Sequence, residues 1–223
     1  GSVRIAQKLG AKKLKNFLKK ISILDRIEFD IEEVGQPQMG ILGKCRLATI
    51  AFGHGISTTP LQLAKGYSVI SNGGYDINPT LIKNLNKNIS KSRILKENVS
   101  KKMNQILRKV VSTKEGTASF ADVLGYEIGG KTGTADQPQD GDYSAKKINT
   151  FVAIFPTSKP KYSLLVLLED PKPNKEYIYN YRDGRPPYKG NYRNTAGWTS
   201  VEIAGKIIEK IGPILATKYL EIN

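Results

Sequence analysis

The stretch Gly130-Lys131-Thr132-Gly133-Thr134-Ala135 is the part of the sequence that decides the fold. The period of its apolar residues and glycines predicts a strand over residues 128–135. Lys131 supplies a fixed cation and Thr132 a hydroxyl donor, which together suit a carboxylate. Gly133 leaves the strand bare, so an extended ligand can approach its backbone. The stretch therefore indicates a peptide-binding or carboxylate-binding strand.

The position of this strand in its sheet decides what it can do. At a sheet edge, an extended peptide can add to it through main-chain hydrogen bonds. The backbone N–H of Thr134 would then donate toward a developing oxyanion, an interaction worth about 3 kcal/mol in a preformed hole. We expect Lys131, Thr132, Gly133 and Thr134 to bind substrate, with Thr134 as the catalytic oxyanion donor. A lone Lys-Thr-Gly also occurs in turns and exposed edges, and a phosphate-binding loop, which we do not favour, is the nearest rival.

Hydrophobic spacing on both sides of the stretch predicts the other elements. Helices are expected over residues 3–20 with a break near Gly10, from Thr58 or Thr59 to residue 71, over 97–111 and over 199–215. Strands are expected over 128–135, 151–155 and 162–168, with a polar loop over 136–149 and a long loop over 171–196. Helices, a three-strand meander and one final helix predict an α+β fold, an antiparallel sheet flanked by helices.

The composition excludes some kinds of site but does not identify the protein's ligand or reaction. Lys and Arg number 35 against 20 Asp and Glu, a formal charge of +15, which favours anionic partners or a solvated lysine-rich surface. Cys45 and His54 are the only residues of their types, which excludes an internal disulfide, a thiolate metal cluster and a histidine-rich metal site. We expect no metal and no cofactor. No apolar run approaches the roughly 20 residues of a membrane helix.

Several segments in order give the stretch a context. Lys131 to Ala135 follows Gly116-Thr117-Ala118 and resembles the third motif of serine penicillin-recognising enzymes. The other segments, Gly53 to Ala64, Asn72-Gly73-Gly74 with Asn78-Pro79, Phe151 to Pro156 and Thr195 to Trp198, resemble class B penicillin-binding proteins of the cell-division type. The likeness covers most of the chain from Ala51 to Leu215, so residues 1–223 read as the C-terminal part of one transpeptidase domain.

This resemblance implies a peptidoglycan D,D-transpeptidase that cross-links stem peptides by serine acyl transfer. Its ligands would be D-Ala-D-Ala stem peptides and β-lactams, whose carboxylate Lys131 and Thr132 would hold while Thr134 supplies half of the oxyanion hole. The family's sheet has five strands, so this chain would hold an incomplete domain and leave the strand over 162–168 without a partner. A glycosyltransferase and cell-division proteins are the expected partners of the intact protein. The resemblance also implies that the intact protein lies on a bacterial inner membrane, with its catalytic domain in the periplasm.

The chain departs from the family in one respect. The Ser-x-x-Lys and Ser-x-Asn motifs should lie upstream of Gly53, where no match occurs. Ser144 to Lys147 fits Ser-x-x-Lys, but it follows the Lys-Thr-Gly motif, and we interpret it as chance. The nucleophile and any membrane anchor are therefore expected to be absent from these residues, and the isolated chain is expected to be inactive and poorly soluble.

Three alternatives stay open on the sequence. A β-lactamase or a penicillin-sensing receptor would share the same motifs. A non-enzymatic basic module would use the positive charge, although no nucleic acid is expected, because no binding motif frames the Tyr and Arg residues over 179–193. A degenerate homologue acting as a scaffold is the third.

Overall fold

The computed structural model describes residues 1–83, 92–139, 142–172, 174–190 and 193–221. The chain forms two compact units, residues 1–100 and 101–223. Helix α5 (Glu97–Ser112) begins in the first unit and continues into the second.

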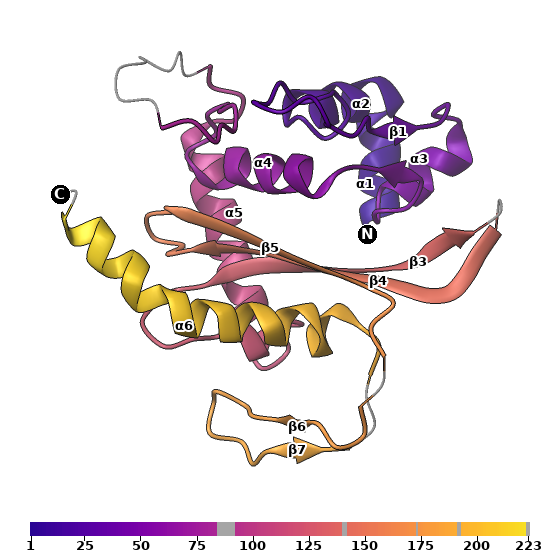
Figure 1. The fold of residues 1–223 in the computed structure, drawn as a ribbon. Helices are drawn as coiled ribbons and strands as arrows, with labels where there is room; N and C mark the ends of the chain where they lie inside the picture. Colours follow the sequence, from indigo (N-terminus) through magenta and orange to yellow (C-terminus); the bar gives the residue numbers. More distant parts are fainter. Residues whose placement is uncertain (84–91, 140–141, 173, 191–192, 222–223) are drawn as a thin grey trace. The chain divides into compact units, whose positions relative to one another are not determined.

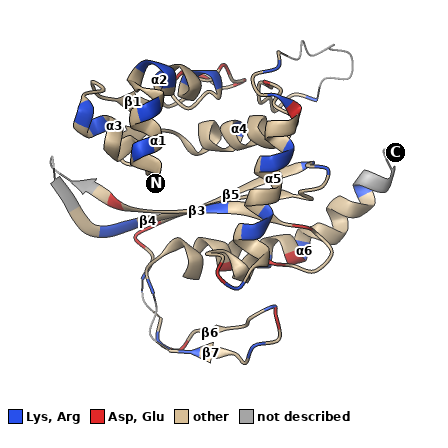
Figure 2. Cartoon of the chain, turned by 180° about the vertical axis from the view of Figure 1, so that it is seen from behind, with Lys and Arg blue, Asp and Glu red and all other residues tan. Residues whose placement is uncertain are grey.

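The first unit is mostly helical (Figure 1). Its elements are α1 (Ser2–Leu9), α2 (Ala11–Lys20), β1 (Gln38–Met39), α3 (Lys44–Ile50), β2 (Ile56–Ser57) and α4 (Pro60–Ser71). Gly10 separates α1 from α2 with a φ of 84°, which confirms the predicted break. Helix α3 and the short pair β1–β2 were not predicted. Figure 2 shows lysines and arginines of this unit on α1, α2 and α3, and the last turns of α1 and α2 end in lysines.

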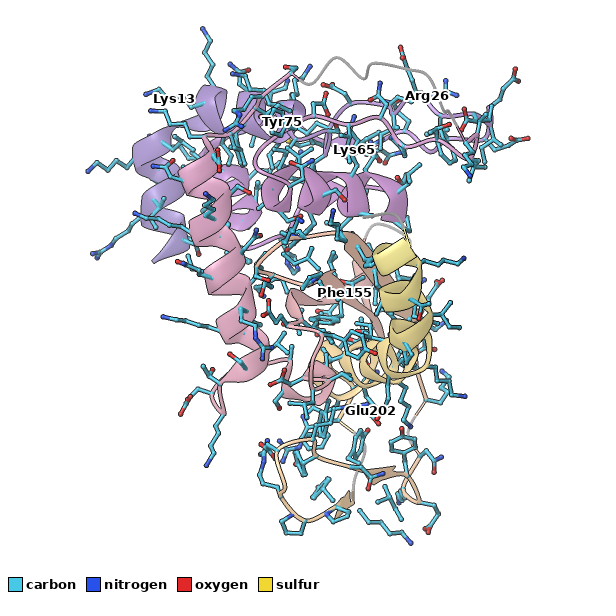
Figure 3. All side chains as sticks on the ribbon, turned by 90° about the vertical axis from the view of Figure 1, so that its left-hand side faces the viewer. Lys13, Arg26, Lys65, Tyr75, Phe155 and Glu202 are labelled. Carbon is cyan, nitrogen blue, oxygen red and sulfur yellow. The ribbon has the colours of Figure 1, made fainter. Side chains whose placement is uncertain are left out.

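Helix α4 starts and stops as its sequence predicts. Thr59 is its N-cap, and a capping box joins its side chain and backbone to Gln62, with Pro60 in the first turn. Past the end of the helix, Gly73 and Gly74 take φ values of 94° and 87°, which favour glycine. Lys65 is labelled in Figure 3 and is 8% exposed, within 3.2 Å of Asp76.

The second unit is built on one antiparallel sheet. Its strands are β3 (Gly129–Gln139), β4 (Asp142–Phe155) and β5 (Tyr162–Glu169), in the order β3-β4-β5. Lys131 lies opposite Val152 and Thr134 opposite Asn149. Within the part of the chain that the structure describes, β3 has β4 as its only strand neighbour, so the Lys-Thr-Gly strand is an edge strand. The predicted meander is confirmed.

The polar loop predicted over residues 136–149 is wrong. Strands β3 and β4 extend through most of this segment, and residues 140–141 lie outside the described residues. Asp136 lies opposite Lys147, and the two side chains form an ion pair. Opposite charges directly across an antiparallel pair stabilise it. Polar residues thus extend the β3–β4 pair beyond the part that the apolar pattern predicts.

Helix α6 (Ser200–Glu221) covers one face of the sheet with the short helices η1 (Ser119–Ala121) and η2 (Ala196–Trp198) (Figure 1). It is longer than the predicted 199–215 and continues past Pro213. The predicted long loop over 171–196 contains a small hairpin, β6 (Ile178–Tyr179) with β7 (Tyr188–Lys189). The core under α6 includes Phe151, Phe155, Val201, Ala204 and Ile208, and Figure 3 labels Phe155 in it.

Candidate active site on the edge of β3

The direction of the backbone groups of β3 follows from the sheet register. Asp170 N donates to Lys147 O at 2.8 Å, in line with the β4–β5 register, so the backbone of Lys147 faces β5. Backbone groups alternate along an antiparallel strand. Residues 148, 150, 152 and 154 of β4 therefore face β3, where they pair with 135, 133, 131 and 129. It follows that the N–H and C=O groups of Thr132 and Thr134 point away from β4, toward the open edge.

Both threonine side chains of this edge have hydrogen-bond partners from other segments. Thr117 Oγ1 and Thr132 Oγ1 lie 3.0 Å apart, and either hydroxyl can be the donor. Ala196 N, in η2, donates to Thr134 Oγ1 at 3.0 Å. These two side chains share the face of Phe151, the face that α6 covers. The edge is therefore supported by segments far apart in the sequence.

Lys131 lies on the opposite face of β3, because successive side chains of a strand alternate. It is exposed, and its Nζ donates to Thr132 O at 2.9 Å. Since the carbonyl of Thr132 points to the open edge, the ammonium group lies at that edge as well. Positive charge, an outward N–H and hydroxyl groups meet along Lys131 to Thr134.

The glycines of the motif have neighbours inside the protein. A Cβ on Gly133 would lie 2.5 Å from Thr150 Oγ1, and one on Gly130 would lie 2.4 Å from Val152 O. The sequence suggests that Gly133 is bare to admit a ligand; in the structure, the Thr150 hydroxyl of the neighbouring strand also crowds this position. Gly129 lies on the same face of β3 as Gly133. A Cβ on Gly129 would lie 2.9 Å from Arg108 N of α5, so the helix packs closely on the start of the strand.

The turn before β3 is held by a carboxylate. Glu127 O accepts from Thr157 N at 2.9 Å, and Glu127 Oε2 accepts from Ser158 N at 3.2 Å. The hydrogen bonds from Ser158 hold the pKa of Glu127 below its ordinary value, with a smaller contribution from Arg108. This carboxylate joins the turn that enters β3 to the turn between β4 and β5.

Sequence reasoning did not assign Thr117 or Ala196 to the site. Both belong to segments quoted above for their family likeness, Gly116 to Ala118 and Thr195 to Trp198, but their contacts with β3 span 15 and 62 residues. No periodicity or short motif reports such a contact. Family likeness around both segments was the one available signal.

A serine nucleophile at a helix start is not found among the described residues. Ser144 lies in β4 and donates to Gln137 O at 3.1 Å, while the Lys147 side chain forms an ion pair with Asp136. A second match to Ser-x-x-Lys, Ser158 to Lys161, lies in the turn between β4 and β5. Neither arrangement activates a serine.

The structure also decides against a phosphate-binding loop. Gly125 to Thr132 does fit the spacing Gly-x-x-x-x-Gly-Lys-Thr. A phosphate-binding loop leads into a helix whose N-terminus faces the phosphates. Gly130, Lys131 and Thr132 lie inside β3, and the chain after them continues as strand.

Among the described residues, no group of three or more His, Cys, Asp or Glu could hold a metal ion. No described helix has the length and apolarity to cross a membrane. A cavity of about 190 Å³ between β5 and the end of α6 has an apolar lining that includes Tyr126, Phe155, Tyr162 and Leu215. The described residues of its lining include no serine, and the Lys131 to Thr134 segment of β3 does not contribute to it. Tyr179 of β6 and Tyr188 of β7 pack on Trp198. Tyr179 is 2% exposed, which leaves this ring no surface for stacking on nucleic acid.

Comparisons with known proteins agree on one family. Residues 1–184 match the model of the penicillin binding protein transpeptidase domain. The probable peptidoglycan D,D-transpeptidase FtsI of Caulobacter vibrioides is 29% identical over 98% of this chain and 36% of its own length. Stage V sporulation protein D of Bacillus subtilis is 34% identical over 77% of this chain and 29% of its own length. The chain thus spans about a third of these curated relatives.

Solved structures agree on the fold. The transpeptidase domain of Burkholderia pseudomallei penicillin-binding protein 3 superposes with a TM-score of 0.78 and 21% identity, over 96% of this chain and 61% of that one. Penicillin-binding protein 3 of Mycobacterium tuberculosis, solved in complex with ampicillin, gives a TM-score of 0.76 and 24% identity, over 94% of this chain and 48% of that one.

Proposed function

Because the chain belongs to the penicillin-binding protein transpeptidase domain family, of class B, we propose that it forms the C-terminal part of one peptidoglycan D,D-transpeptidase domain. The edge of β3 carries this proposal. Its outward N–H groups, the hydroxyl groups and the Lys131 ammonium suit an extended peptide that ends in a carboxylate.

The proposed reaction is acyl transfer at D-Ala-D-Ala. A serine oxygen attacks the carbonyl carbon of the penultimate D-Ala, and a lysine base takes the serine proton and passes it to the departing D-Ala amine. An amine of a neighbouring stem peptide then attacks the acyl-enzyme and releases the serine. In this scheme Lys131, Thr132 and Gly133 hold the substrate strand and its carboxylate, and the Thr134 N–H binds the oxyanion. The serine and its lysine come from outside residues 1–223.

A β-lactam is the natural probe of this site. Its strained amide takes the place of the scissile peptide bond, and its carboxylate takes the place of the substrate's terminal carboxylate. For the intact protein we further propose a periplasmic catalytic domain on a bacterial inner membrane. Its partners would be a glycosyltransferase and cell-division proteins.

Labelling with a fluorescent penicillin tests this function. The full gene product that contains residues 1–223 is expected to form a stable covalent adduct, and residues 1–223 alone are expected to form none. Absence of label on the full product contradicts the acyl-transfer function. Label on residues 1–223 alone contradicts the proposed origin of the serine. Sustained hydrolysis of a chromogenic cephalosporin would favour a β-lactamase.

A further inference from the structure

The hydroxyl of Thr117 forms a hydrogen bond with Thr132 on the β3 edge, and the proposed reaction gives this hydroxyl no role. Its Oγ1 lies 3.0 Å from Thr132 Oγ1. Thr117 is exposed and Thr132 half-buried, so the pair lies at the surface of the edge where the carboxylate would bind. A hydroxyl has one hydrogen to donate and lone pairs that can accept. The direction of the Thr117–Thr132 bond therefore decides what Thr132 can offer a ligand.

The backbone around Thr117 is held on two sides. Ala118 N donates to Val110 O at 3.1 Å and Gly116 N to Thr113 O at 3.0 Å, which ties the segment to the end of α5. On the other side, a Cβ on Gly197 would lie 2.7 Å from Thr117 O, so η2 packs directly against it. Thr117 is thus placed by the fold beside Thr132, and its hydroxyl does not meet Thr132 by chance.

The second threonine of the edge shows which direction suits an anion. Thr134 Oγ1 accepts from the backbone N–H of Ala196, a group that can only donate. The hydrogen of the Thr134 hydroxyl is therefore left for another acceptor. If Thr117 donates to Thr132, the Thr132 hydroxyl is in the same state. If Thr132 donated to Thr117 instead, it would present only lone pairs to a carboxylate.

We propose that Thr117 is a positioning residue for ligand carboxylates: it donates to Thr132 Oγ1 and so turns the Thr132 hydroxyl hydrogen toward the anion. This inference rests on the proposed function and adds a residue outside the Lys-Thr-Gly motif. The donated bond also polarises the Thr132 hydroxyl, and hydrogen bonds in such chains strengthen one another. The ligand class is any substrate or inhibitor with a carboxylate beside the reacting amide.

The test compares two ligands and three variants of the full gene product. Thr117→Val removes the hydroxyl and Thr117→Ser keeps it. Thr113→Val is the matched control, because the Thr113 hydroxyl bonds to Lys109 O within the same helix end. Acylation rate constants are measured with benzylpenicillin and with its methyl ester, which lacks the charge. We expect Thr117→Val to slow the penicillin about fivefold to tenfold, the size of one lost hydrogen bond, and the ester less than about twofold.

Thr117→Ser and Thr113→Val are expected to behave as the wild type with both ligands. An equal loss for penicillin and ester in Thr117→Val would overturn the inference, because it would show a general distortion of the edge. No loss for either ligand would overturn it as well. Failure of the wild type to react would instead contradict the proposed function. In that case the same variants are compared by NMR titration with N-acetyl-D-Ala-D-Ala and its methyl ester, where only the free acid should bind more weakly to Thr117→Val.

Discussion

The two edges of the β3-β4-β5 sheet differ in what they present. By the register derived above, the backbone groups of Thr132 and Thr134 point outward on β3, and those of Ser163, Leu165 and Leu167 point outward on β5. Both edges lack a further strand among the described residues. Both edges therefore present outward N–H and C=O groups of the backbone, and the two edges differ in their side chains.

The side chains of β3 suit a polar ligand, and those of β5 suit another strand. At the β3 edge, two threonine hydroxyls have partners from η2 and the Thr117 segment, and an ammonium group lies beside them. The sequence of β5, YSLLVLLE, is mostly apolar, and Leu167 is 41% exposed. An apolar open edge is a template for strand pairing. We therefore propose that one sheet carries a ligand edge on β3 and, on β5, an edge that a strand outside residues 1–223 covers.

The largest difference in acylation rate between the two edges is expected when one outward N–H is removed from each of them. Thr134→Pro deletes the proposed oxyanion donor without removing a bond to β4, because proline is tolerated where the N–H faces outward. We expect acylation of the full gene product by fluorescent penicillin to fall about 100-fold to 1,000-fold. Thr134→Val, which keeps the N–H and loses the hydroxyl, measures the side-chain part of the effect.

The comparison variant is Leu165→Pro, which deletes the matching N–H from β5. Because we propose that a strand outside residues 1–223 pairs with β5, this proline removes a ladder hydrogen bond there. If circular dichroism shows that the variant folds, it should label at a rate close to that of the wild type. Equal losses in Thr134→Pro and Leu165→Pro would mean that the sheet, and not the β3 edge, was damaged. Normal labelling of Thr134→Pro would remove Thr134 from the mechanism.

A smaller loss is expected when a hydroxyl is removed from each edge. Thr132→Val deletes the proposed donor to the carboxylate, and a hydrogen bond to a charged group contributes enough to slow acylation about 10-fold to 100-fold. Ser163→Val makes the matching change on β5, where Ser163 is exposed, and should have no such effect. Stopped-flow acylation rates of the two variants give the comparison directly. Comparable rates in both would argue that the edges do not differ in function.

A charge on the β5 edge should improve the solution behaviour of residues 1–223. Leu167→Lys places a charge on the open strand, which discourages edge-to-edge pairing. We expect a several-fold higher soluble concentration and a shift toward monomer in sedimentation velocity. Ile106→Lys is the control, since Ile106 is 54% exposed on α5 and lies on no sheet edge. If both variants improve solubility equally, exposed apolar surface in general is responsible, and the β5 edge is not special.

The smallest expected effect concerns the turns that precede β3 and β5. Because Ser158 lowers the pKa of Glu127 in the folded chain, the stabilisation is present above the unfolded pKa of about 4.3 and is lost as the pH falls through the folded value. Glu127 is exposed, so less than about 1 kcal/mol is involved. Thermal unfolding from pH 6 to pH 3 should show a slightly smaller acid loss in Glu127→Gln. Identical pH profiles would mean that the Ser158 contact contributes nothing.

Local chemistry explains which elements could be predicted. Thr59, Pro60 and Gln62 specify the start of α4 through contacts within one turn, and Gly10 specifies a break through its own φ. Strand period and apolar runs located the three-strand meander. These signals are carried by neighbouring residues, so they can be read without the fold.

The features that were missed depend on residues far apart in the chain. Asp136 and Lys147 extend β3 and β4 through a pairing that has no apolar period, and so their segment resembled a loop. The contacts of Thr117 and Ala196 with the edge depend on how η1, η2 and α6 pack on the sheet. Of the proposed site, the motif residues come from the sequence, and the structure adds the groups that bond to their hydroxyls.

Amide hydrogen exchange along β3 tests the central claim most directly. In the free full gene product, the amides of Thr132 and Thr134 should exchange fast and those of Lys131 and Gly133 slowly, because only the latter pair face β4. After acylation by penicillin, Thr134 should become protected while the outward amides of Leu165 and Leu167 stay unchanged. A Thr134 amide that is protected in the free protein, or that penicillin leaves unprotected, would contradict the account.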